Sequence, residues 1–164
     1  MYRACCCVLL AAWALSGQTT RGTAAPSPQT IDKLNSAMAA LKTAKAPSDV
    51  LGRQLADSMM ALAIGDRQPV PSDVEGFTSE FTRALAGRGF NNDQGAVLQQ
   101  CLLDIVRGTG TSNLSVAQHL RETLTALRVD NPATDAVIKR FLAIGEAVRG
   151  PDDSPLRDKR IRGK

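Results

Sequence analysis

Apolar residues recur at every third or fourth position along most of this chain, and this spacing constrains the fold more than any other feature. The period matches the turn of an α-helix, so it aligns apolar side chains on one helix face. Six segments between residues 30 and 150 show the pattern, separated by Gly, Pro or residues that cap helices. No stretch alternates apolar and polar residues as a half-buried strand does. The sequence therefore predicts an all-α fold, a single six-helix bundle over residues 30–150.

Residues 91–108 are predicted to form the central helix of this bundle. Their apolar side chains cover more than one helical face, which is typical of a helix that packs against several neighbours. The segment also holds the one cysteine that lies outside the first 25 residues. Its apolar residues are Val97, Leu98, Cys101, Leu102, Leu103, Ile105 and Val106.

Capping patterns predict where several helices begin. Ser48 precedes one helix as its N-cap, and the patterns Ser72–Glu75 and Ser115–Gln118 each have the spacing of a capping box. The pattern Ser-Asp-Val-x-Gly occurs twice, beginning at Ser48 and at Ser72. Because the likeness ends after each glycine, we interpret it as reused capping chemistry and not as a structural repeat.

Residues 1–25 are predicted to form a signal peptide. An apolar run of twelve residues follows Arg3, which suits the core of a signal peptide but is shorter than the roughly 20 residues that a membrane span needs. Cleavage is predicted after Ala25, with an alternative site after Ser16, and residues 26–29 form a flexible leader. The protein is therefore expected to be exported, to the periplasm or the extracellular space.

Positive charge gathers at the two ends of the chain. Residues 26–156 carry 13 basic and 15 acidic residues, which argues against a nucleic-acid-binding face. Residues 151–164 are predicted to be a disordered basic tail, which either tethers the protein to an anionic membrane or cell-wall surface or only keeps it soluble. The basic residues of this tail are Arg157, Lys159, Arg160, Arg162 and Lys164.

Few residues of the expected mature chain could carry catalysis or bind a metal. His119 is its one histidine and Cys101 its one cysteine, whereas metal sites need several such ligands together. Asn91–Gly95 has part of the spacing of a calcium loop, but an ordinary helix start fits it better because no glutamate closes the loop. The sequence predicts no catalytic residue, no metal site and no cofactor.

Two smaller features concern modification. Cys101 is predicted to be a buried free thiol because apolar residues surround it at helical spacing, although an exported cysteine could also form an intermolecular disulfide. Asn113-Leu114-Ser115 matches the acceptor pattern for N-glycosylation, which would matter only in a eukaryotic source.

These observations favour an exported, non-catalytic interaction or binding module with a protein partner. One alternative is a protein held at a membrane or cell-wall surface by its tail. The other is an enzyme that uses Cys101, His119 or the carboxylates of residues 73–80. Small side chains favour the first hypothesis, since they let helices approach closely or leave a groove for a partner helix. These are Ala37, Ala39, Ala40, Ala44, Ala56, Ala61 and Ala63.

Overall fold

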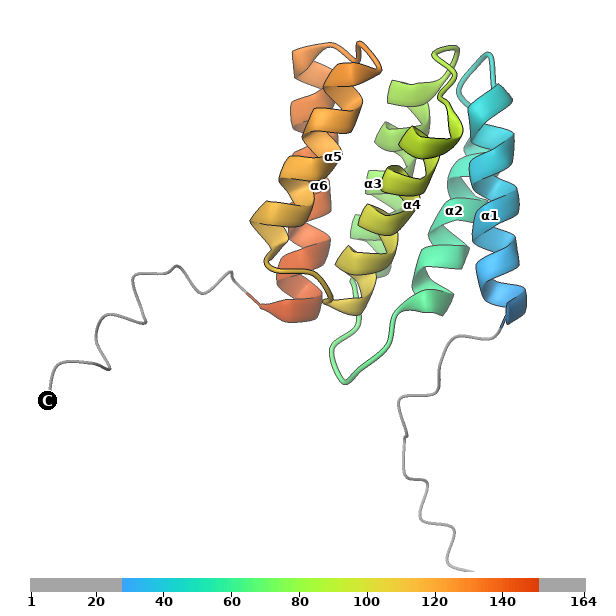
Figure 1. Ribbon diagram of the computed structural model, residues 1–164. Helices are drawn as coiled ribbons and strands as arrows, with labels where there is room; N and C mark the ends of the chain where they lie inside the picture. The colour runs from blue at the N-terminus through green and yellow to red at the C-terminus, as the bar shows by residue number, and fades with distance from the viewer. Residues whose placement is uncertain (1–27, 151–164) are drawn as a thin grey trace, which may run out of the picture.

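The computed structural model describes residues 28–150, and they form an all-α bundle of six helices without a strand (Figure 1). The helices are α1 (Pro28–Thr43), α2 (Asp49–Leu62), α3 (Pro71–Leu85), α4 (Asn92–Arg107), α5 (Asn113–Ala126) and α6 (Asn131–Arg149). The predicted signal peptide and basic tail lie outside the described residues. The flexible leader was predicted over residues 26–29, but its last two residues, Pro28 and Gln29, already belong to α1.

The helices lie in two layers of three. In one layer α4 lies between α1 and α5, and in the other α3 lies between α2 and α6, as the helix contacts and Figure 1 agree. Successive helices run in opposite directions because short loops join them. One end of this array is therefore the α1–α2 pair, and the other end is the α5–α6 pair.

The centre of the core is aromatic, although residues 28–150 contain only four phenylalanines. Phe77 stacks on Phe81 within α3, with ring centroids 5.3 Å apart. Phe77 also meets Phe141 of α6 at 5.5 Å. All three side chains are fully buried. Aliphatic residues fill the space around the rings, and the Phe77–Phe141 pair contributes to the contact between α3 and α6.

Helix α4 packs against α1, α2, α5 and α6, a wider set of neighbours than any other helix has. This agrees with its prediction as the central helix. One side of α4 nevertheless faces solvent, and Val97 on that side is 42% exposed. The prediction of Val97 as a core residue is wrong because α4 packs against other helices on one side only, and no helix within residues 28–150 covers its opposite side.

Two predicted helix starts agree with the structure in detail. The Ser48 hydroxyl accepts a hydrogen bond from the Leu51 N–H at 3.3 Å, so Ser48 caps α2. At α4, the Asn91 side chain accepts from the Gln94 N–H at 2.8 Å. The Gln94 side chain accepts from the Asn91 N–H at 3.0 Å, which completes a capping box. These bonds satisfy N–H groups that have no partner inside the helix.

Both predicted capping boxes that involve Ser72 and Ser115 are wrong. Helix α3 begins at Pro71, one residue before Ser72, and its N-cap Val70 makes no side-chain hydrogen bond. Proline suits this first position because its fixed φ is helical and it has no N–H to satisfy. Helix α5 begins at Asn113, and Ser112 caps it by accepting from the Ser115 N–H at 3.0 Å.

Candidate functional site

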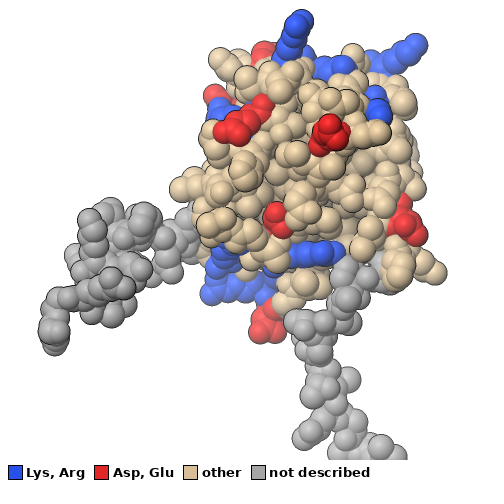
Figure 2. All heavy atoms as spheres, viewed as in Figure 1, with Lys and Arg blue, Asp and Glu red and all other residues tan. Residues whose placement is uncertain are grey.

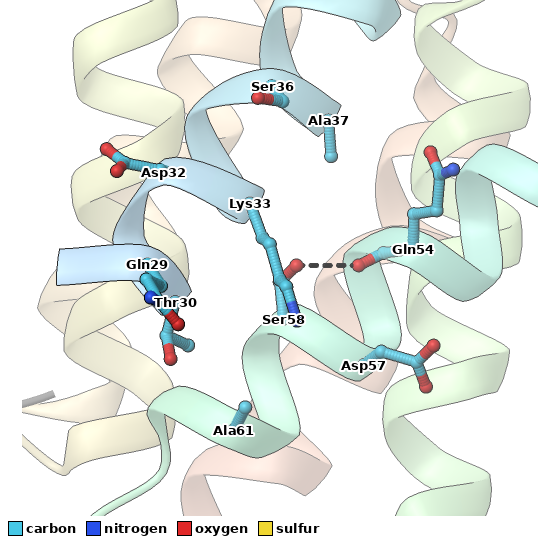
Figure 3. Close-up of a pocket in the computed structure, with 10 residues that line it drawn as sticks. All are labelled: Gln29, Thr30, Asp32, Lys33, Ser36, Ala37, Gln54, Asp57, Ser58 and Ala61. Carbon is cyan, nitrogen blue, oxygen red and sulfur yellow. Dashed lines mark hydrogen bonds between the residues drawn. The ribbon is translucent and has the colours of Figure 1, made fainter. Parts of the chain in front are cut away.

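A groove runs between the first half of α1 and the second half of α2 (Figure 3), at the end of the two-layer array that these two helices form. It encloses about 600 Å³. Every lining residue belongs to α1 or α2, so no third helix among the described residues closes it. The lining residues are Gln29, Thr30, Asp32, Lys33, Ser36, Ala37, Gln54, Asp57, Ser58 and Ala61.

The floor of the groove consists of short side chains. Ala37 and Ser58 are buried, with exposed fractions of 3% and 4%, and Ser36 and Ala61 lie beside them. The Ser58 hydroxyl donates its proton to the Gln54 backbone oxygen at 2.7 Å (Figure 3). Its oxygen can therefore only accept a hydrogen bond from a ligand. The floor is mostly apolar and offers this one buried polar atom.

The rim of the groove carries charges of both signs. Asp32 and Lys33 come from α1 and Asp57 from α2, and all three are exposed. In Figure 3, Lys33 extends from α1 towards α2, whereas Asp32 and Asp57 point to opposite sides. A ligand lying in the groove would thus meet an apolar surface along its centre and charged groups along both edges.

Cys101 lies in the core and not at this groove. Its side chain is 3% exposed, and the sulfur is 3.8 Å from the Val116 backbone oxygen of α5. Burial, helped by the nearby Asp104 charge, raises the pKa of the thiol to about 11. Because the thiolate is the reactive form, a thiol with this pKa is unreactive at neutral pH.

His119 and the carboxylates of the enzyme hypothesis are also elsewhere. His119 is exposed on α5. Glu80 of α3 pairs with Arg83 at 3.2 Å, and Glu75 lines a separate hollow of about 240 Å³ beside α2. Within residues 28–150 no three His, Cys, Asp or Glu side chains are grouped as metal ligands. The structure does not bring these residues together with Cys101 in one pocket.

Two further motifs have structural roles. The amide oxygen of Asn91, considered for a calcium loop, accepts the hydrogen bond that begins α4. Asn113, in the glycosylation pattern, is 3% exposed, and its amide donates to the Gly150 backbone oxygen at 3.3 Å. A glycan cannot be attached to this amide while the chain is folded. The five basic tail residues lie outside the described residues, so the structure does not locate them.

The groove was only partly foreseen. Ala37 and Ala61 belong to the alanines that we expected to leave room for a partner helix, and both line it. Ser36 and Ser58 were missed because serine was considered only as a cap. Small residues of any polarity on facing helix turns would have been the signal to search for.

No protein-family model, curated protein or solved structure matches this chain. None of the helices within residues 28–150 is long and apolar enough to cross a membrane. The geometry of the groove is therefore the observation on which a function has to be argued.

Proposed function

We propose that this protein acts, after export, as a non-catalytic binding module whose α1–α2 groove receives an α-helix of a partner protein. The observation that carries this proposal is the groove itself, with its floor of small side chains between two antiparallel helices. The predicted signal peptide of residues 1–25 supports export by its sequence.

A helix is the partner segment that fits this groove best. Helices pack with their axes about 8–10 Å apart, and the closest approach needs small residues at the contact. Ala37, Ser58 and Ala61 supply that surface. A partner helix laid there would continue the two-layer array beyond α1 and α2, in the way that α3 and α6 already pack side by side.

The rim predicts the composition of the partner helix. Its buried face would carry small apolar residues at spacings of three and four, and its flanks would carry basic residues to meet Asp32 and Asp57. An acidic residue near the middle would meet the Lys33 ammonium. These exposed charges would direct the orientation of the helix more than they would strengthen its binding.

A pair of alanine substitutions tests this proposal. Ala61 and Ala126 are both exposed, and each lies in the last turn of its helix. Ala61→Arg places a long side chain in the groove, whereas Ala126→Arg adds the same side chain on α5. We expect partners captured from the exported fraction by cross-linking to bind the native protein and Ala126→Arg, and to be lost from Ala61→Arg. Dichroism should show both variants folded.

The captured partner then allows a direct measurement. On adding the segment of that partner that cross-links, amide hydrogen exchange should slow in residues 29–37 and 54–61 and stay unchanged in α5 and α6. Binding that survives in Ala61→Arg with full affinity, or protection confined to other helices, would refute the groove as the binding site.

A further inference from the structure

The α1–α2 groove lies where the described chain begins. Helix α1 starts at Pro28, and its next two residues, Gln29 and Thr30, line one end of the groove (Figure 3). Residues 1–27 precede this point and lie outside the described residues. Whatever side chains they carry are therefore held close to the groove for as long as the chain is uncut.

The apolar run of the predicted signal peptide, residues 4–15, has the composition that the groove requires of a helix. On a helical wheel four of its small residues share one face, because they recur at spacings of three and four. That face matches the floor of short side chains, which calls for small residues at a close helix contact. Leu9 and Trp13 would point away from the groove, where docking leaves them as exposed as before. The residues of the small face are Ala4, Cys7, Ala11 and Ala14.

The charges near this run complement the rim of the groove. Arg3 is the only charged residue before Arg21, and no acidic residue precedes Asp32. Asp32 and Asp57 lie on the rim. Figure 2 shows an acidic but no basic side chain at the lower right edge of that face, where the first half of α1 lies. Arg3 can therefore pair with either aspartate. Lys33 gains no partner, so this segment should bind more weakly than a helix that carries an acidic residue.

We propose that residues 4–15 occupy the α1–α2 groove as a helix while the predicted signal peptide is attached, and that its cleavage uncovers the groove. This inference rests on the proposed function of the groove as a site for a helix. Residues 16–27 form the connection. These twelve residues span about 40 Å when extended at about 3.3 Å each, whereas a helix of twelve residues is about 18 Å long. The connection therefore reaches either end of the groove.

The connection also makes a weak contact effective. A short flexible linker gives a local concentration on the order of 1 mM. A helix of about twelve residues is marginal in water by itself, so we expect an intrinsic dissociation constant of roughly 0.1 mM, which this local concentration exceeds about tenfold. Occupation of about nine-tenths of the groove would lower its affinity for a partner helix about tenfold. After cleavage the released peptide no longer has this local concentration and leaves the groove.

Hydrogen exchange before and after cleavage tests the proposal. A recognition site for a specific protease, placed within residues 18–24 of the full chain, allows the segment to be cut from the folded protein and removed. Amide exchange in residues 29–37 and 54–61 should be several-fold slower before the cut than after it, and unchanged in α5 and α6. The full chain with Ala61→Arg, which blocks the groove, should show no such difference.

A cross-link locates the segment independently of exchange. Cys5→Ser and Cys6→Ser leave Cys7 as the reactive thiol, since Cys101 is only 3% exposed. With Ala61→Cys added, the full chain should form an intramolecular disulfide under mild oxidation, because residue 61 lines the groove that the small face of the segment enters. Peptide mapping at low protein concentration identifies this disulfide.

The variant Ala126→Cys, on exposed α5, is the matched control, and its disulfide with Cys7 should form at least about ten times more slowly. Equal rates for the two variants, or exchange in the groove that the cut does not change, would overturn the proposal. Binding of the partner helix separates it from the proposed function. If the cut protein and the full chain bind the partner equally well, only this inference fails. If the cut speeds exchange in the groove but no partner binds, only the proposed function fails.

Discussion

The same five-residue pattern occurs twice in this protein and has a different role each time. In Ser48–Gly52 the serine caps α2 and the valine is 65% exposed. In Ser72–Gly76 the serine is the second residue of α3 and caps nothing, and the valine is completely buried. A short motif therefore does not define a structural role until the first residue and the buried face of its helix are known.

Pro71 accounts for the different role of the serine. It takes the first position of α3, so Ser72 lies inside its helix, whereas Ser48 precedes its helix as the N-cap. The valines differ for another reason. Val74 continues the buried stripe of Phe77 and Phe81, whereas the buried stripe of α2 begins at Leu51, one residue or about 100° of helix after Val50.

Substitution of the valines should give the largest difference in stability between the two motifs. Val74→Asp would bury a charge without a partner, which costs roughly 3–5 kcal/mol and could prevent folding altogether. Val50→Asp would place the same charge in the first turn of α2, where it stabilises a helix by about 0.3–1 kcal/mol. Urea unfolding followed by far-ultraviolet dichroism measures both. Equal effects at the two positions would contradict the different burial of the two valines.

The helices could be predicted from the sequence, but their exact starts could not. The apolar spacing extends over four or five turns of each helix, so a single residue that breaks the pattern does not hide the helix. All six helices could therefore be predicted. A start depends on one or two residues, and at Ser72 the capping pattern competed with a proline one residue earlier. Val50, Val74 and Val97 all fit an apolar stripe in the sequence, yet only Val74 is buried.

The α1–α2 groove and the exposure of Val97 were harder to predict because both depend on which helix faces the other helices leave uncovered. Ala37 and Ala61 are as compatible with a closed helix contact as with a groove. The two-layer arrangement places α1 and α2 at one end, where no other helix within residues 28–150 covers the space between them. Val97 is exposed for a similar reason, since no described helix lies in front of α4.

Substitution of the serines should give a smaller difference in stability between the two motifs. Ser48→Ala removes the hydrogen bond to the Leu51 N–H and should destabilise the protein by about 1 kcal/mol. Ser72→Ala removes no cap, and alanine is the better helix former, so stability should rise by a few tenths of a kcal/mol. Thermal and urea unfolding of the two variants should therefore shift in opposite directions. Loss of stability in Ser72→Ala would mean that Ser72 caps α3 after all.

Substitution of the glycines should give the smallest difference in stability between the two motifs. Alanine in place of a glycine inside a helix stabilises it by about 0.5–1 kcal/mol if the new methyl group fits. At Gly52 the nearest atom would be the Thr82 hydroxyl oxygen at 3.7 Å, an ordinary contact, so Gly52→Ala should gain the full amount. At Gly76 the methyl group would lie 2.3 Å from the Arg140 guanidinium, which must move.

Arg140 is exposed and can move at little cost, so Gly76→Ala should still stabilise the protein, but by less than Gly52→Ala. The double variant Gly76→Ala, Arg140→Ala is the control, because without the guanidinium the substitution at Gly76 should gain as much as that at Gly52. A Gly76→Ala penalty that persists when Arg140 is removed would show that α3 and α6 pack too closely for a methyl group. The two motifs would then also differ in how closely a neighbouring helix packs against the glycine.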